Sequence, residues 1–277
     1  MNFKDKKYQK ENELFIDKQK QSNIKVDDKT LLIYPNITKK SQFKLKESIK
    51  DLEIKCDCKI HFDGLDYYII IPYKASKTNE LKSGIISLDP GIRTFLSGVD
   101  TTRKIEIGDK ANEFIYPLLK KLDKYISNKS KFKKSSKKYI QISKMIKHLR
   151  KRIKNLQQEL HKKTSSWLCK NYKNIIIPDF ESVKMSKKAG RKIRSKTVRQ
   201  MSVLAHKEFI QRLKTKAIET NSNVLIVEES YTSKTCSSCL LVKDKKFTGK
   251  RFKCDGCKLN IDRDTNGSIN IFKKLFS

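Results

Sequence analysis

Two Cys-x2-Cys pairs near the C-terminal end constrain the fold of this chain more than any other feature of its sequence. Cys236 and Cys239 form the first pair, Cys254 and Cys257 form the second, and a short segment separates them. Each pair places two thiolates on one tight turn, and two such turns complete the tetrahedral sulfur shell that suits zinc. Because all four positions are cysteines, no coordination position is open to a substrate. The spacing therefore predicts a structural zinc ribbon over residues 233–257.

Disulfide bonds are the alternative use of these cysteines, and they require an oxidising compartment. The N-terminal segment "MNFKDKKYQKENELF" lacks the apolar core of a secretory signal. The sequence also contains no run of about 18 apolar residues, so no membrane-spanning helix is expected. We therefore expect zinc rather than disulfides, in an intracellular, reducing compartment and without a membrane partner.

The chain is strongly basic from end to end. Its 277 residues include 64 Lys and Arg against 30 Asp and Glu, which gives a formal net charge of +34. A distributed positive charge favours a polyanionic partner, because binding releases the counterions condensed on phosphates. A lysine-rich genome is the alternative explanation for part of the excess. The balance predicts a nucleic acid partner.

The pattern of apolar residues divides the N-terminal half of the chain into three regions. Residues 1–28 are polar and are expected to be flexible, whereas residues 29–80 predict a small β-rich module. Residues 83–108 predict strands joined by short turns, including a tight Asp-Pro-Gly turn at Asp89. Residues 109–171 predict two helices from apolar side chains three to four positions apart. The charged surface of this hairpin is either a phosphate-binding face or an ordinary solvated one.

The C-terminal half predicts strands within 174–183 and at 224–229, a helix at 203–220 and a closing helix after Asp264. The basic segment 185–202 is expected to be a mobile loop. Alternating strands and helices of this kind predict an α/β domain built on one sheet.

Several acidic residues stand at the ends of these elements: Asp89, the adjacent Glu228 and Glu229, and the pair Asp262 and Asp264. Each has an ordinary structural interpretation, because Asp is common in turns and at helix N-caps. Together at one edge of a sheet, they would form a carboxylate cluster. Such a cluster would bind two hard divalent ions, Mg²⁺ or Mn²⁺, as phosphodiester cleavage requires.

Five segments carry a family resemblance: "SLDPGIRTFLSG", "LHKKTSSWL", "YTSKTCSSC", "CDGC" and "DRDTNGSINI". In this order they resemble the OrfB-type transposon proteins, which comprise the TnpB nucleases and their eukaryotic and viral relatives, the Fanzors. The resemblance covers about residues 83–277, while residues 29–80 resemble the end of the family's β-barrel wedge region.

The resemblance implies a RuvC-like nuclease domain of RNase H fold over residues 83–232 and 258–277, with a helical insertion at 109–171 and an inserted zinc ribbon. It implies an enzyme of the kind historically labelled a transposase: a metal-dependent DNA endonuclease whose partners are DNA and a guide RNA. Asp89 matches the first catalytic acid. The family pattern Asp-x-Asn-Gly/Ala-x-x-Asn-Ile begins at Asp264, which matches the last. Asp262 would then flank the site without binding metal.

The middle catalytic acid departs from the common pattern. Most TnpB proteins have a glutamate at the end of the strand that here contains Pro178, and proline cannot bind a metal. Asp179 and Glu181 are near, but a shift of one residue points Asp179 to the opposite face of the strand. Fanzors supply a glutamate from the strand before "YTSKTC". The resemblance therefore implies Glu229 as the third ligand, with Glu228 as the alternative.

The second departure from the family pattern is length. Family members usually carry a longer N-terminal region than this sequence shows, with a helical recognition lobe and a complete wedge barrel. The alternative function is a non-catalytic, nucleic-acid-binding relic of such a nuclease. The two interpretations differ in whether another acid takes the place of Pro178 in space.

Overall fold

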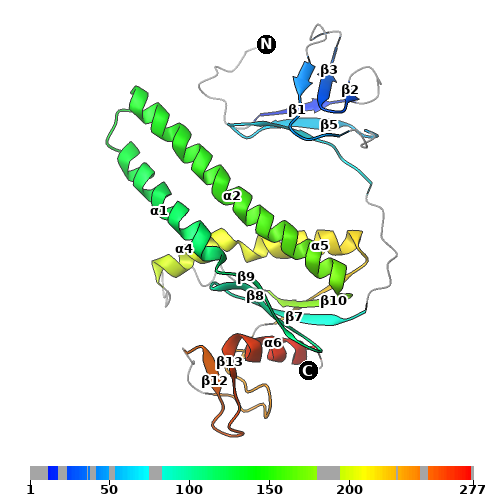
Figure 1. Cartoon of the computed structure of the whole chain (residues 1–277), viewed down its shortest axis with the longest axis vertical. Helices are drawn as coiled ribbons and strands as arrows, with labels where there is room; N and C mark the ends of the chain where they lie inside the picture. Colours follow the sequence, from blue (N-terminus) through cyan, green and yellow to red (C-terminus); the bar gives the residue numbers. More distant parts are fainter. Residues whose placement is uncertain are drawn as a thin grey trace. The chain divides into compact units, whose positions relative to one another are not determined.

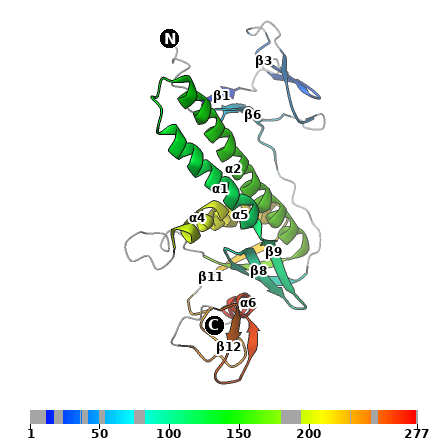
Figure 2. The same ribbon diagram turned by 60° about the vertical axis from the view of Figure 1, so that its left-hand side comes forward.

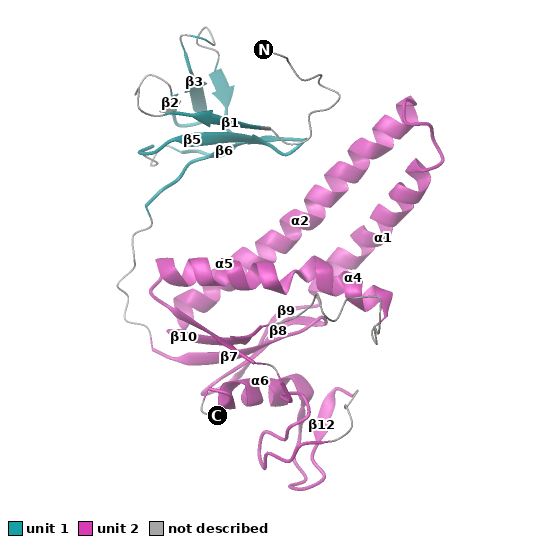
Figure 3. Ribbon diagram, turned by 180° about the vertical axis from the view of Figure 1, so that it is seen from behind, with its two compact units in different colours: residues 1–75 teal, residues 76–277 magenta. Residues whose placement is uncertain are grey.

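The computed structural model describes residues 12–17, 24–35, 37, 42–49, 54–74, 83–179, 194–228, 230–243 and 249–275. The chain divides into two compact units, residues 1–75 and 76–277 (Figure 3). No helix among the described residues is long and apolar enough to cross a membrane.

The first unit consists of two three-stranded antiparallel sheets. One has the order β1–β5–β6, with strands Asn12–Ile16, Cys58–Phe62 and Tyr67–Ile70. The other has the order β2–β3–β4, with strands Ile24–Asp27, Thr30–Ile33 and Gln42–Lys44. Their buried side chains form one small core: Ile16, Ile24, Leu31, Ile33 and Cys58.

The expectation of a flexible segment over residues 1–28 is wrong for two parts of it. Strands β1 and β2 both lie inside that segment, and β1 pairs with β5 along its whole length. The short alternation around Ile16 is enough for a strand once β5 offers a partner, because tertiary pairing outweighs local polarity. Residues 1–11 lie outside the described part of the chain.

The second unit is built on a five-stranded mixed sheet of order β11–β10–β7–β8–β9 (Figure 1). Its strands are β7 Ile85–Pro90, β8 Thr94–Asp100, β9 Lys104–Asp109, β10 Asn174–Pro178 and β11 Asn223–Val227. β7, β10 and β11 run parallel, while β8 and β9 pair antiparallel with their neighbours. The predicted mixed α/β architecture is confirmed.

The two faces of this sheet are covered by different helices. One face presents Ile86, Leu88, Ile175 and Ile177, all fully buried, to α2 and α5. The other face presents Ser87 and Asp89, and the C-terminal helix α6, Arg263–Lys273, packs there. Because successive side chains of a strand point to opposite faces, Asp89 lies on the face of β7 opposite the buried side chains Ile86 and Leu88.

The predicted helical hairpin is present as α1, Ala111–Lys129, and α2, Lys137–Asn171 (Figure 2). Ser136 caps α2, since its side chain accepts a hydrogen bond from the N–H of Tyr139 at 3.2 Å. The seam between the helices is apolar at the periodic positions: Ile115, Leu119, Leu122, Ile146, Leu149 and Ile153.

The segment expected to be a basic loop contains a helix instead. Residues 194–202 are described, and α4 runs from Ser195 to Leu204 with Met201 and Leu204 buried. Ala205 then adopts a left-handed conformation, φ 45°, and α5 continues from His206 to Glu219. The single helix predicted over 203–220 is thus interrupted near its start. Residues 180–193 lie outside the described part of the chain.

Candidate metal centres

The four cysteines of the predicted ribbon converge on one point. Their sulfur atoms all lie within 4.8 Å of one another, with 3.6 Å between the Sγ atoms of Cys236 and Cys257 and 3.5 Å between those of Cys239 and Cys254. Thiolates about 2.3 Å from one zinc ion at tetrahedral corners are about 3.8 Å apart. Within the described residues, this is the one group of three or more His, Cys, Asp or Glu side chains that could share a metal.

The two halves of the ribbon repeat the same local geometry. Leu240 follows the first pair and Lys258 the second, and both are left-handed, with φ values of 62° and 61°. In each half, the first cysteine donates its N–H to the carbonyl five positions later, at 2.9 Å to Leu241 and 2.8 Å to Leu259. The hairpin of β12 Arg251–Lys253 and β13 Asn260–Asp262 flanks the second half. The sulfur shell is therefore preformed by backbone geometry.

The surroundings of the thiols differ between the two halves. Burial raises the pKa of Cys236 to about 11. The backbone N–H of Leu259 lowers the pKa of Cys257 to about 6, and that of Cys257 lowers the pKa of Cys254. Backbone N–H groups directed at sulfur stabilise the thiolates that zinc requires.

Asp89 lies within strand β7 and not at a turn as predicted. Asp89 is paired with Ser97 of β8, and the next residue, Pro90, is paired with Leu96. The turn follows at residues 91–93, where the N–H of Gly91 donates to Phe95 O at 3.1 Å. Because the acid belongs to a central strand, its backbone is fixed by pairing on the sheet.

Asp264 is the second residue of α6 and is half-buried. Its Oδ1 accepts hydrogen bonds from the neighbouring Arg263, at 3.3 Å from Nε and 3.2 Å from Nη2. The guanidinium therefore neutralises this carboxylate from one side.

Asp262 caps the helix. Its Oδ1 accepts from the N–H groups of Asp264 and Thr265 at 3.1 and 3.0 Å, and Lys104 lies 3.3 Å away. Burial alone would raise the pKa of Asp262, but hydrogen bonds from Thr265 and Lys104 outweigh it and lower the pKa. These interactions account for Asp262 as a structural cap, which fits the prediction that it flanks the site.

Helix α6 packs against the first predicted acid and carries the last. A Cβ atom at Gly267 would stand 2.7 Å from Oδ2 of Asp89, so the helix backbone lies directly against this carboxylate. Asp264 is three residues before Gly267 and therefore lies on the same face of the helix, one turn away. Two further bonds fix the contact: Ser87 Oγ donates to Ser268 O at 2.6 Å, and Ser268 Oγ donates to Ser97 O at 3.0 Å.

The strand that should carry the middle acid ends at Pro178, which is buried and pairs with Val227 of β11. In the parallel pairing of β10 with β7, Ile176 is the partner of Ser87. Two residues further along each strand, Pro178 is level with Asp89. Parallel neighbours in register point to the same face. Pro178 thus occupies the face of Asp89 and provides no ligand there.

Of the candidates for the middle acid, the described part of the chain contains two. Asp179 is exposed, one residue out of phase with Pro178, and its N–H donates to Val227 O at 3.2 Å. Glu228 is also exposed, one residue out of phase with Val227, and accepts a hydrogen bond from Ser230. Glu181 and Glu229 lie outside the described residues.

Two residues near the site were not predicted to act, although they belong to the motif after Asp264. Asn266 and Asn270 are buried, and their amides bond to the segment that enters the ribbon. The signal for them was their four-residue spacing on one face of the closing helix.

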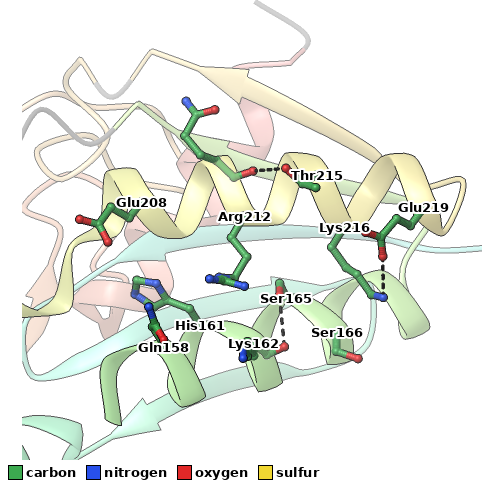
Figure 4. Close-up of a pocket in the computed structure, with 11 residues that line it drawn as sticks. Gln158, His161, Lys162, Ser165, Ser166, Glu208, Arg212, Thr215, Lys216 and Glu219 are labelled. Carbon is green, nitrogen blue, oxygen red and sulfur yellow. Dashed lines mark hydrogen bonds and ion pairs between the residues drawn. The ribbon is translucent and has the colours of Figure 1, made fainter. Parts of the chain in front are cut away.

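A groove of about 620 Å³ runs between α2 and α5 (Figure 4). Its lining includes Lys162, Arg212 and Lys216, of which Lys216 pairs with Glu219 at 2.9 Å. Because α2 and α5 cover the face of the sheet opposite α6, this groove is separate from the acidic residues.

The helical hairpin presents a strongly basic surface. From Lys124 to Gln158 the sequence contains no aspartate or glutamate, while lysine and arginine recur on both helices. Several lysines lie over aromatic rings, for example Lys129 over Tyr139 at 5.1 Å and Lys138 over Phe132 at 5.6 Å. A surface with this charge is suited to a phosphate backbone.

Comparison with known proteins gives consistent results. The family model described as "Cas12f1-like, TNB domain" matches residues 206–271. The chain is 26% identical over 266 residues to "TnpB-like protein L79" of Acanthamoeba polyphaga mimivirus, which covers 91% of this chain and 50% of that protein. It is 31% identical over 122 residues to "Putative RNA-guided DNA endonuclease InsQ" of Escherichia coli (strain K12), covering 40% and 30% of the two chains.

Among solved structures, a chain of a CRISPR-Cas12f ternary complex superposes with a TM-score of 0.51 at 16% identity. The match covers 78% of this chain and 45% of that one, and it shows a shared fold. The chain spans about half the length, or less, of these relatives.

Proposed function

The chain belongs to the TnpB family, and from this premise we propose that it is a transposon-associated, metal-dependent DNA endonuclease guided by RNA. The supporting observation is the contact of Gly267 with Asp89, because it packs α6, which carries Asp264, against the strand that carries Asp89. The mixed sheet, the acid within a central strand and the acid at the start of the closing helix support a RuvC-like, RNase H-type nuclease domain.

We assign the divalent ions to Asp89, Asp264 and Glu229, with Glu228 as the alternative. The choice of Glu229 rests on the family resemblance, while Glu228 is exposed and directly follows Val227, the last residue of β11. Mg²⁺ or Mn²⁺ held by these carboxylates would activate water and stabilise the leaving oxygen of a phosphodiester.

The chain's own residues have separate tasks in this proposal. Asp89 and Asp264 supply hard oxygen ligands from rigid elements, which keeps their positions fixed before substrate arrives. Arg263 compensates the charge of Asp264 through Oδ1, so that the second oxygen remains for a metal. The basic hairpin and the basic side chains of α4 bind the backbones of DNA and guide RNA. The four cysteines hold zinc in a purely structural role.

The test is DNA cleavage by the full chain purified together with its bound RNA, in Mg²⁺ and in its absence. Asp89→Asn and Asp264→Asn should each reduce the cleavage rate by at least about 10²-fold, since each removes a charged metal ligand. Asp179→Asn is the matched control, because this exposed acid lies one residue out of phase with the site. Equal cleavage by Asp89→Asn and wild type would refute the assignment.

The second candidate is a nucleic-acid-binding relic without catalysis, and Pro178 is the observation that favours it. This alternative would be established if the wild-type chain binds RNA and DNA with strong salt dependence but does not cleave DNA with any copurified RNA.

A further inference from the structure

Helix α6 has two functional stripes that face different partners. One stripe, with Asp264, Gly267 and Ser268, lies against β7 and β8. The other stripe contains Asn266, Asn270 and Lys273, at the four- and three-residue spacing of one helix face, and contacts the entry to the zinc ribbon. The same eleven-residue helix therefore touches the acid site and the cysteine site at once.

The second stripe binds the ribbon through buried, directional hydrogen bonds. Asn266 is fully buried; its Oδ1 accepts the N–H of Ser237 at 2.9 Å and its Nδ2 donates to Thr235 O at 2.8 Å. Asn270 donates to Thr235 O at 2.7 Å and to Thr232 O at 2.9 Å. Ser237 stands inside the first Cys-x2-Cys turn, between Cys236 and Cys239. The amide of Asn266 thus contacts the metal-binding turn itself.

These bonds require residues 232–237 to keep the backbone conformation that presents the first Cys-x2-Cys turn to the sulfur shell. An asparagine that loses its partners while still buried leaves polar groups unsatisfied, at a cost of about 1–3 kcal/mol for each group. A shift of α6 that relieves this cost also moves Gly267 away from Asp89, because the helix is rigid over its three turns.

We propose that Asn266 and Asn270 are positioning residues that couple the zinc-loaded ribbon to the divalent-ion site formed by Asp89 and Asp264. The inference rests on the proposed function, because it assumes that these acids bind Mg²⁺ or Mn²⁺. Zinc held by the four cysteines then fixes the ribbon entry, the two asparagines transmit that order to α6, and α6 places Asp264 beside Asp89. The carboxylate site for Mg²⁺ or Mn²⁺ thus depends on the zinc site, although the four cysteines bind neither of these ions.

The experiment measures Mn²⁺ affinity of the full chain from the EPR signal of free Mn²⁺. It compares wild type, Asp89→Asn and the double variant Asn266→Ala/Asn270→Ala, each with zinc bound and after zinc removal. Co²⁺ absorption of the cysteine shell reports whether that shell is intact. Ser222→Ala is the matched control, since its buried hydroxyl lies 3.2 and 3.1 Å from the carbonyls of Cys169 and Tyr172, away from α6.

In wild type we expect Asp89-dependent Mn²⁺ binding that weakens when zinc is removed, since coupling between two sites is reciprocal. In the double variant we expect Mn²⁺ binding at least about tenfold weaker, no further effect of zinc removal and an unchanged Co²⁺ spectrum. The loss of the zinc effect is the signature of coupling, because general destabilisation would not remove it. Ser222→Ala should behave like wild type.

Unchanged Mn²⁺ affinity in the double variant would overturn the inference and leave the proposed function standing. Absence of Asp89-dependent Mn²⁺ binding in wild type would instead reject the proposed function, and the inference with it. If the double variant does not fold, the single variant Asn270→Ala decides, because it removes only the bonds to Thr235 O and Thr232 O and keeps those of Asn266. Its Mn²⁺ affinity should then fall about threefold, and an unchanged value would overturn the inference.

Discussion

Gly267 lies so close to Asp89 that the α-carbon of the helix and the carboxylate of the strand leave no room for a methyl group between them. A Cβ atom at position 267 would stand 2.7 Å from Oδ2 of Asp89, well inside van der Waals contact. In this chain, Gly267 thus permits a close approach to Asp89 and does not serve a turn, since it lies within α6.

Gly267→Ala should therefore impair metal binding more than stability. Alanine favours a helix over glycine by about 1 kcal/mol, which offsets much of the roughly 1–3 kcal/mol that an overpacked contact costs. The displaced Asp89 carboxylate should weaken Mn²⁺ binding and slow cleavage, each by about 10–100-fold. Thermal unfolding and Mn²⁺ titration of the same preparation separate the two effects. A variant that cleaves at the wild-type rate would contradict the proposed geometry.

The two adjacent glutamates after β11 should differ in their importance. Glu229→Gln should reduce cleavage by at least about 10²-fold, because the proposed function assigns the third metal ligand to this carboxylate. Glu228→Gln is the matched control and should retain most of the activity, since Glu228 is exposed and out of phase. Cleavage rates at saturating Mg²⁺ test both, and the reverse order of effects would show that Glu228 is the ligand.

Zinc should bind at about one ion per chain and should be lost on mutation of any ribbon cysteine. Cys236→Ser should abolish binding and unfold the ribbon, because Cys236 is fully buried and its sulfur lies 3.6 Å from that of Cys257. Cys56→Ser is the control, since this exposed thiol belongs to the first unit and lies outside the cysteine group. Elemental analysis of purified protein gives the stoichiometry, and full zinc content in Cys236→Ser would disprove the assigned shell.

The sequence predicted those features whose signals are local. The ribbon followed from cysteine spacing, and the hairpin of α1 and α2 followed from periodic apolar residues such as Ile146 and Leu149. The turn at Asp89 was mispredicted because Asp-Pro-Gly usually ends a strand, whereas pairing of Pro90 with Leu96 extends this one. The spacing of Asn266 and Asn270 indicates a shared helix face but not their partners, because Ser237 and Thr232 lie 29 and 38 residues away in sequence.

The stability of the second unit should depend on pH through its buried histidines. Phe95 stacks on the rings of both His206 and His161, at centroid distances of 4.9 and 5.5 Å. His206 Nε2 donates to Phe95 O at 3.1 Å, and His161 Nε2 donates to Leu204 O at 2.8 Å. Burial lowers the pKa of His206 to about 4 and also lowers the pKa of His161. Both side chains are therefore neutral in the folded protein at pH 7.

The sign of the effect follows from proton uptake. Between pH 6.5 and about 4, the unfolded chain binds a proton at His206 and the folded chain does not, so stability falls as the pH falls. The loss from His206 alone reaches about 3 kcal/mol near and below pH 4, at about 1.36 kcal/mol for each pKa unit. Burial alone would raise the pKa of Asp100, but hydrogen bonds from Thr102, Tyr172 and Arg103 hold it well below its usual range. Protonation of Asp100 therefore lowers the unfolding free energy only at a lower pH than protonation of His206 does.

Urea unfolding of wild type and His206→Gln at several pH values between 4 and 7 measures this dependence. Glutamine can still donate to Phe95 O but does not titrate, so the variant should show a smaller loss of unfolding free energy over this range. His148→Gln is the matched control for the substitution itself, because His148 is exposed on α2. Protonation of a ring buried against Phe95 costs free energy. Identical pH profiles for His206→Gln and wild type would therefore show that His206 is not the titrating group.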